Sequence, residues 1–149
     1  MTSKQLALLI GGLVPAIGLG VAAIWQKLSG HYGIATGPFL IISGLVISLV
    51  GTVFLFLERD TAVTWNAVGL TVLFALFWAV SSGAISYTLR KLGGSISQLV
   101  PLYNTNTLVA VLVGLIFLAE WKTVHPVKIL VASLLIISGG VLASRSSLP

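Results

Sequence analysis

Residues 39–57, FLIISGLVISLVGTVFLFL, form a stretch of nineteen residues without a charged side chain, and this stretch decides the fold class. Strands that cross a membrane need about ten residues in which apolar and polar side chains alternate. The stretch does not alternate, and its length is close to the roughly 20 apolar residues of a membrane-spanning helix. It therefore predicts a helix in a lipid environment.

The rest of the chain has the same character. Of the 149 residues, 57% are hydrophobic and 7% are charged, whereas charged residues make up roughly 25% of a soluble domain. The charged residues separate five apolar intervals, which predict membrane spans at residues 5–26, 39–57, 66–89, 97–119 and 127–144. We expect an all-α integral membrane protein in which residues 1–149 form one domain, a bundle of five transmembrane helices.

The composition excludes several classes of function. The net charge of +5 comes from basic residues that are scattered singly or in pairs, so they do not form the basic face of a nucleic-acid-binding protein. The chain has no cysteine, which excludes disulfides and thiolate chemistry. The apolar interval after Lys4 is longer than that of a signal peptide, and we expect it to be a retained span.

No charged side chain is expected deep inside a span, because Lys128, near the start of the last span, can snorkel to the interface. The acidic residues Glu58, Asp60 and Glu120 lie at the ends of predicted spans, and His31 and His125 lie in predicted loops. The pattern provides no converging set of acid, base or ligand groups at membrane depth. It therefore argues against an enzyme, a metal site and a bound cofactor.

Uncharged polar residues provide the candidate substrate site. The helical period places Asn104 and Thr107 on one face of the fourth predicted span, and Trp78, Ser82 and Ser86 on one face of the third. We expect these two polar stripes to line a cavity for an uncharged or zwitterionic small molecule. For the serines, hydrogen bonding between helices is an equally good interpretation. The candidate substrate-binding residues are Trp78, Ser82, Tyr103, Asn104, Asn106 and Thr107.

An odd number of spans puts the two termini on opposite sides of the membrane. Many transporters build their site from two repeats of inverted topology, so a five-span chain is expected to be one half of such a transporter. Its partner is then a second copy, in a homodimer, or a related half, in a heterodimer.

Lysine and arginine residues in short loops set the orientation of a membrane protein. Here the two sides tie, which predicts either insertion in both orientations or one weakly biased orientation. The basic residues are Lys4, Arg59, Lys122 and Lys128 on the N-terminal side and Lys27, Arg90, Lys91 and Arg145 on the other.

Prolines and small residues suggest how the helices bend and pack. Pro15 lies in the middle of the first predicted span, where it removes a backbone hydrogen bond and can kink the helix. Such a kink could serve gating in a transporter or be tolerated in a static protein. Glycines and serines three or four residues apart, as at Gly44 and Ser48, are typical of close helix packing.

Residues 97–145 carry a pattern that resembles a known family. Pro101 lies early in a span, Gly114 lies in the following apolar stretch, and Glu120 ends that stretch just before Trp121-Lys122. The last span then contains Ser138-Gly139-Gly140. This pattern resembles the EamA-like repeat of the drug/metabolite transporter superfamily, and the chain is similar to the five-span members of that superfamily.

The resemblance implies an α-helical carrier in the inner membrane of a prokaryotic cell, which moves a small organic metabolite by alternating access as a dimer of five-helix halves. It implies structural or gating roles for Pro101 and Glu120, beside Pro15. Small multidrug resistance proteins of the same superfamily depend on a glutamate in their first span, and residues 5–26 contain no acid. Proton-coupled multidrug export is therefore not expected. The alternative is a non-transporting subunit or packing partner of another transporter half.

Overall fold

The computed structural model describes residues 2–146, and all regular secondary structure among them is helical. Five helices are long and apolar enough to cross a membrane, which confirms the predicted all-α fold with five such helices. They are Gln5–His31, Thr36–Glu58, Trp65–Lys91, Ile96–Phe117 and Pro126–Ser144. Several helices run beyond the predicted spans, because a charged residue such as Lys27 ends an apolar interval without ending a helix.

The chain divides into two compact units, residues 1–93 and residues 94–149, and each is described by itself. The helices of the first unit are α1 (Ser3–Leu8), the π-helix η1 (Leu9–Leu13), α2 (Val14–His31), α3 (Thr36–Glu58) and α4 (Trp65–Lys91). The helices of the second unit are α5 (Ile96–Tyr103), α6 (Asn106–Phe117), the 3₁₀-helix η2 (Glu120–Lys122) and α7 (Pro126–Ser144).

The first helix continues through Pro15 by widening into a π-helical turn. Proline has no backbone N–H, and its ring crowds the carbonyl group four residues earlier. The chain relieves this crowding in η1, where the N–H of Val14 donates to the carbonyl oxygen of Leu9, five residues back. Pro15 is then the second residue of α2. The local distortion expected at Pro15 takes the form of this wide turn.

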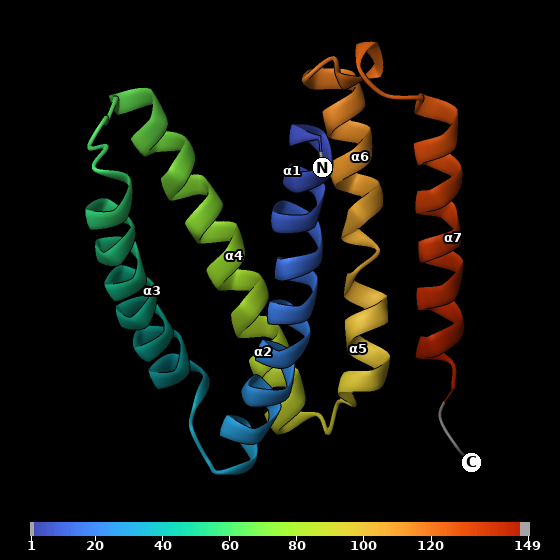
Figure 1. The fold of residues 1–149 in the computed structure, drawn as a ribbon. Helices are drawn as coiled ribbons and strands as arrows, with labels where there is room; N and C mark the ends of the chain where they lie inside the picture. The colour runs from blue at the N-terminus through green and yellow to red at the C-terminus, as the bar shows by residue number, and fades with distance from the viewer. Residues whose placement is uncertain (1, 147–149) are drawn as a thin grey trace. The chain divides into compact units, whose positions relative to one another are not determined.

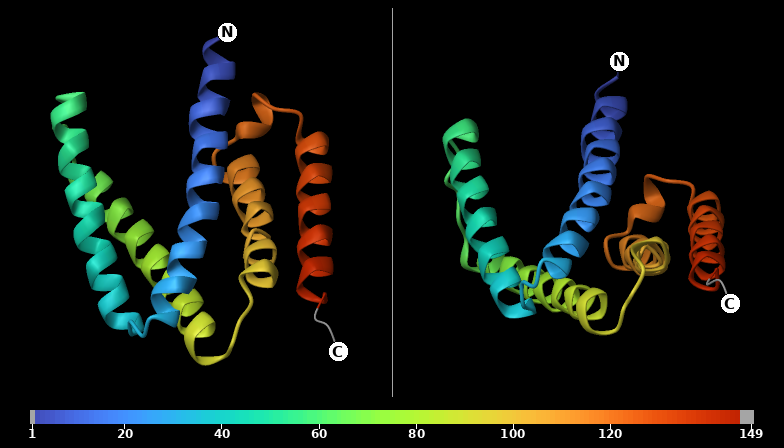
Figure 2. Two further views of the ribbon diagram at one scale, coloured as in Figure 1. Left: turned by 60° about the horizontal axis from the view of Figure 1, so that its bottom comes forward. Right: turned by 90° about the horizontal axis from the view of Figure 1, so that it is seen from below.

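The three long helices of the first unit pack together at one end. The side-chain amide of Gln26 on α2 donates a hydrogen bond of 3.0 Å to the carbonyl oxygen of Ser82 on α4. A Cβ atom placed on Gly83 of α4 would lie 3.3 Å from Cδ1 of Leu40 on α3. Away from this end every residue from 44 to 78 is exposed. Figures 1 and 2 show α2 and α4 approaching at their C-terminal ends and separating toward their N-terminal ends.

In the second unit, α7 runs antiparallel beside α5 and α6 (Figures 1 and 2). The face of α7 that carries Ser133 and Gly140 is buried, with Ser133 only 2% exposed. These two residues are seven apart, so they lie two turns apart on one side of the helix. Gly139, by contrast, is exposed. Of the small residues in this helix, Ser133 and Gly140 therefore make the helix contact.

Candidate functional site

The fourth apolar helix is interrupted in its interior. The predicted span of residues 97–119 is not a continuous α-helix, because α5 ends at Tyr103, α6 begins at Asn106 and α6 ends at Phe117. Asn104 and Thr105 form a turn between the two halves. Figure 2 shows α5 and α6 following one another along nearly the same axis. The interruption therefore changes the hydrogen bonding of the helix more than its direction.

The residues at the interruption account for it. Residues 104–107 read Asn-Thr-Asn-Thr, four poor helix formers whose short polar side chains compete for backbone groups. The hydroxyl of Thr107 donates to the carbonyl oxygen of Asn104 at 2.7 Å, and the N–H of Thr107 donates to the same oxygen at 3.1 Å. Both donors lie three residues after the acceptor. This tighter spacing replaces the α-helical spacing of four residues.

The tighter spacing removes donors from two backbone carbonyls. Thr105 donates to Leu102 at 3.1 Å, so Pro101 loses the donor that lies four residues after it in an α-helix. Thr107 donates to Asn104, so Tyr103 loses its donor in the same way. The carbonyl of Pro101 lies against Gly140 of α7, where a Cβ atom on residue 140 would collide with the carbonyl oxygen. Helix α7 therefore covers one of the two carbonyls.

The carboxamides of Asn104 and Asn106 are exposed at this interruption. Among residues 2–146, neither carboxamide makes a hydrogen bond to another group. The eight residues of α5 are about 12 Å long, so the amides lie well inside a helix whose 22 residues are about 33 Å long. Tyr103 beside them is half-buried. The interruption thus places two free amides in the interior of an apolar helix.

The polar stripe on α4 has a different setting. Trp78 is 41% exposed, Ser82 is half-buried and Ser86 is 3% exposed, so burial increases toward the packed end. Gln26 of α2 holds the backbone carbonyl of Ser82, and one turn further Gly30 of α2 lies next to Arg90. This row of contacts is called the α2–α4 seam below. Ser86 lies between these two contacts along α4 and is buried.

The structure brings together four of the six candidate substrate residues: Tyr103, Asn104, Asn106 and Thr107 surround the interruption between α5 and α6. Trp78 and Ser82 lie on α4 in the other unit. The hydroxyl of Thr107 is used within the chain, so its first role is to shape the interruption. Sequence reasoning missed the interruption itself, although the run of poor helix formers at 104–107 was its signal.

Glu120 folds back over the helix that precedes it. Ala119 adopts a left-handed conformation with φ of 54°, which reverses the chain between α6 and η2. As a result Oε2 of Glu120 lies 2.8 Å from the position that a Cβ atom on Gly114 would occupy. A side chain at residue 114 would require the carboxylate to move aside. The carboxylate therefore covers the C-terminal end of α6. Glu120 thus lies at the end of the fourth apolar helix, where the sequence predicts it.

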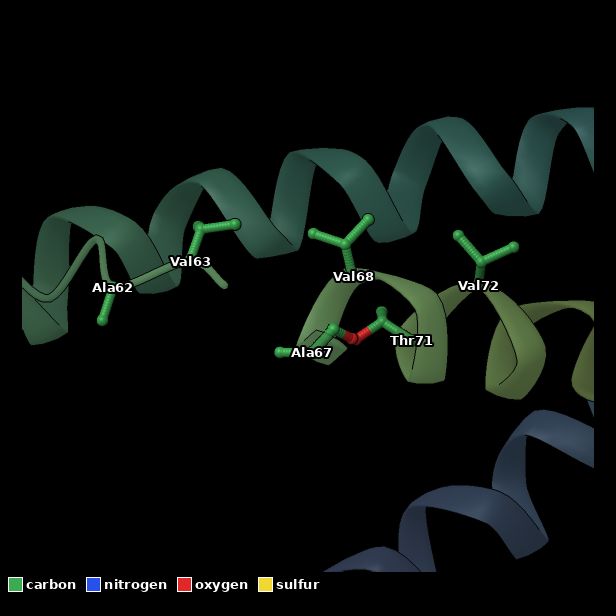
Figure 3. Close-up of a pocket in the computed structure, with 6 residues that line it drawn as sticks. All are labelled: Ala62, Val63, Ala67, Val68, Thr71 and Val72. Atoms are coloured by element: carbon green, nitrogen blue, oxygen red, sulfur yellow. The ribbon is translucent and has the colours of Figure 1, made fainter. Parts of the chain in front are cut away.

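A hollow of about 330 Å³ lies beside the start of α4 and is distinct from the interruption (Figure 3). Val63, Val68 and Val72 line the hollow, and their side chains point toward α3. The hydroxyl of Thr71 donates to the carbonyl oxygen of Ala67 at 2.8 Å, so it is satisfied within the helix. The six described residues that line the hollow therefore offer apolar surface and no free polar side chain that could orient a substrate.

Comparison with known proteins yields no match to a family model, a curated protein or a solved structure. Among residues 2–146, no group of three histidine, aspartate or glutamate side chains is placed to hold a metal ion. The geometry of the two units therefore carries the functional argument.

Proposed function

We propose that this protein is a multi-pass inner-membrane transporter half, which moves a small uncharged or zwitterionic metabolite by alternating access. The observation that carries the proposal is the pair of free carboxamides, Asn104 and Asn106, inside an interrupted apolar helix. Transporters typically form their substrate sites at interrupted helices near the middle of the bilayer. The resemblance of residues 97–145 to EamA-like repeats supports the same function.

In a membrane, the two unpaired carboxamides of Asn104 and Asn106 indicate contact with water or a solute. An amide without a hydrogen-bond partner in an apolar medium costs roughly 2–7 kcal/mol, so each carboxamide needs a partner or water. Irregular backbone at membrane depth is tolerated where it is buried in protein or lines a water-filled cavity. Two exposed amides beside a carbonyl freed at Tyr103 fit the second case. They supply donors and acceptors for a hydrogen-bonding solute without supplying a charge.

Dimerisation completes the proposed transporter. With five spans the chain has one copy of the repeat, and an oppositely oriented second copy or related half supplies the other. The exposed residues 44–78 and the exposed N-terminal part of the first helix leave ample apolar surface for a partner and for lipid.

The test is transport by a variant that lacks both amides. Purified Asn104→Leu/Asn106→Leu protein is reconstituted into vesicles and compared with the wild type for uptake of labelled amino acids, sugars and nucleosides. We expect the substrate that the wild type moves to be moved about 5- to 150-fold more slowly by the variant, because two hydrogen bonds to the substrate, about 0.5–1.5 kcal/mol each, are lost.

The matched control is Ser48→Leu/Thr52→Leu on α3, which also replaces two exposed polar residues by leucine. Their hydroxyls donate within their own helix, to Gly44 and to Ser48, so transport should stay normal. Normal transport by the asparagine variant would refute the site. Absence of transport by the wild type itself would favour the alternative, a non-transporting subunit.

A topology measurement tests the dimer. Because the chain has no cysteine, single cysteines at Ser3 and Ser146 can be labelled in intact cells with an impermeant maleimide. Labelling of each site in half of the molecules indicates that both orientations coexist, so that an antiparallel homodimer alone can supply the inverted repeat. Complete labelling of one site alone indicates a fixed orientation. The opposite half is then a related chain, or the protein has a role other than alternating access.

A further inference from the structure

The α2–α4 seam ends in a cluster of basic side chains. Gly30 of α2 contacts Arg90 of α4, since a Cβ atom on residue 30 would lie 3.8 Å from Cβ of Arg90. Lys27 lies three residues before Gly30, on the same side of α2. Lys91 follows Arg90 in the last turn of α4. We call Lys27, Arg90 and Lys91 the basic end.

Acidic side chains of the first unit lie far from the basic end. Helix α3 starts close to it, because a Cβ atom on Gly83 would lie 3.7 Å from Cγ2 of Thr36. Glu58 is the last residue of α3, whose 23 residues are about 34 Å long, and Asp60 follows it. The two carboxylates of this unit are therefore at the opposite end of α3 from the three cations.

Helix dipoles balance only part of this positive charge. Helices α2 and α4 both end here, and each C-terminus carries the equivalent of about −0.5 charge. Two such ends offset about one of the three cations, whereas the N-terminus of α3 nearby adds about half a positive charge. The basic end therefore keeps a surplus of at least about two positive charges, which suits an anion.

Apolar side chains flank Lys27 on α2. Ile24, Trp25 and Leu28 are exposed on α2 next to Lys27, and Tyr32 is 86% exposed just beyond the helix. Tryptophan and tyrosine are enriched at the level of the lipid headgroups. The anion that fits cations at this level, beside exposed apolar side chains, is one that carries acyl chains.

We propose that the basic end binds the phosphate of an anionic phospholipid, with Arg90 and the two lysines on the headgroup and the exposed apolar side chains of α2 along the acyl chains. The proposal rests on the membrane placement proposed above and is independent of transport. Basic sites between membrane helices bind anionic headgroups in this way, and Arg matches phosphate geometry with two parallel hydrogen bonds.

The experiment compares two variants that lose the same charge. Lys27→Gln/Arg90→Gln/Lys91→Gln removes the basic end, and Arg59→Gln/Lys122→Gln/Lys128→Gln removes three cations elsewhere. Each purified protein is mixed in detergent with phosphatidylglycerol or phosphatidylcholine, and bound lipid is counted by native mass spectrometry. We expect the wild type and the control to prefer phosphatidylglycerol. The basic-end variant should lose about five-fold in affinity per cation, roughly 100-fold in all.

Three outcomes would overturn the proposal. The first is equal binding of the two lipids by the wild type, and the second is an equal loss in both triple variants. The third is binding of inorganic phosphate that phosphatidylglycerol does not exceed, since the site would then take the free ion. If the basic-end variant does not fold, Lys91→Gln alone changes one exposed side chain and should still reduce phosphatidylglycerol binding about five-fold.

Discussion

The α2–α4 seam and the contact between α5 and α7 join helices in opposite ways. In the seam, polar groups lie inside the contact: Gln26 bonds to the carbonyl of Ser82, and Ser86 is buried. Between α5 and α7, a backbone carbonyl meets a glycine, and the polar side chains Asn104 and Asn106 remain exposed. At this contact the two carboxamides stay free for another partner.

This difference decides which polar residues are candidates for binding. A hydroxyl or amide used in packing has its hydrogen bond already, and it gains little from a solute. Among the described residues, the carboxamides of the two asparagines make no hydrogen bond. Helix α7 packs against α5 through Gly140 and does not use them. The backbone carbonyl of Ser82 is thus already occupied by Gln26, whereas the carboxamides of Asn104 and Asn106 are available to a substrate.

The largest effect is expected at Gly140. Gly140→Ala places a methyl group against the carbonyl of Pro101, 3.1 Å from its carbon atom and 3.4 Å from Cγ2 of Thr105. Backbone cannot move aside as a flexible side chain can, so we expect a loss of about 1–3 kcal/mol in the free energy of unfolding. Unfolding in mixed micelles of mild detergent and dodecyl sulfate measures it.

Gly139 is the matched control for this prediction. It precedes Gly140 in the same helix, and a Cβ atom there meets nothing within 4 Å. Because alanine favours a helix over glycine by about 0.5–1 kcal/mol, Gly139→Ala should be neutral or stabilising. Equal effects of the two substitutions would show that α5 and α7 do not depend on the glycine contact.

A smaller effect is expected in the seam. Gln26→Met keeps the length of the side chain and removes the hydrogen bond to Ser82. Hydrogen bonds between membrane helices are worth about 0.6 kcal/mol on average and up to about 1.7 kcal/mol, and we expect a loss in this range. Ser48→Ala, which removes a bond within α3, should change stability by about 0.5 kcal/mol or less in the same assay. A loss no larger than that of the control would mean that apolar packing alone holds the seam.

The sequence was sufficient for the number and type of helices, because charge-free intervals such as residues 39–57 depend on composition alone. It was not sufficient for the interruption at residues 104–105, because poor helix formers remain helical wherever packing compensates them. The sequence also did not predict that Glu120 folds back onto Gly114. This fold-back depends on a left-handed backbone conformation at Ala119, which alanine rarely adopts. The sequence indicated Ser82 as a polar residue of the third span. It did not predict that the backbone carbonyl of Ser82 accepts a hydrogen bond from Gln26.

The smallest effect on the free energy of unfolding is expected at Thr107, at the interruption between α5 and α6. Thr107→Val removes the hydroxyl that holds the carbonyl of Asn104, which then can accept the N–H of Leu108, four residues on. Thr71→Val removes an equivalent bond in α4, where the carbonyl of Ala67 already has an α-helical donor. We expect both substitutions to change the global free energy of unfolding by about 0.5 kcal/mol or less.

Amide hydrogen exchange separates the two variants. In Thr107→Val, exchange at residues 105–108 should slow, because these N–H groups gain α-helical partners. In Thr71→Val, exchange around residue 71 should stay unchanged, since the backbone pattern of α4 does not depend on the hydroxyl. Unchanged exchange in Thr107→Val would show that the asparagines, rather than the threonine hydroxyl, cause the interruption, and that the site keeps its shape without Thr107.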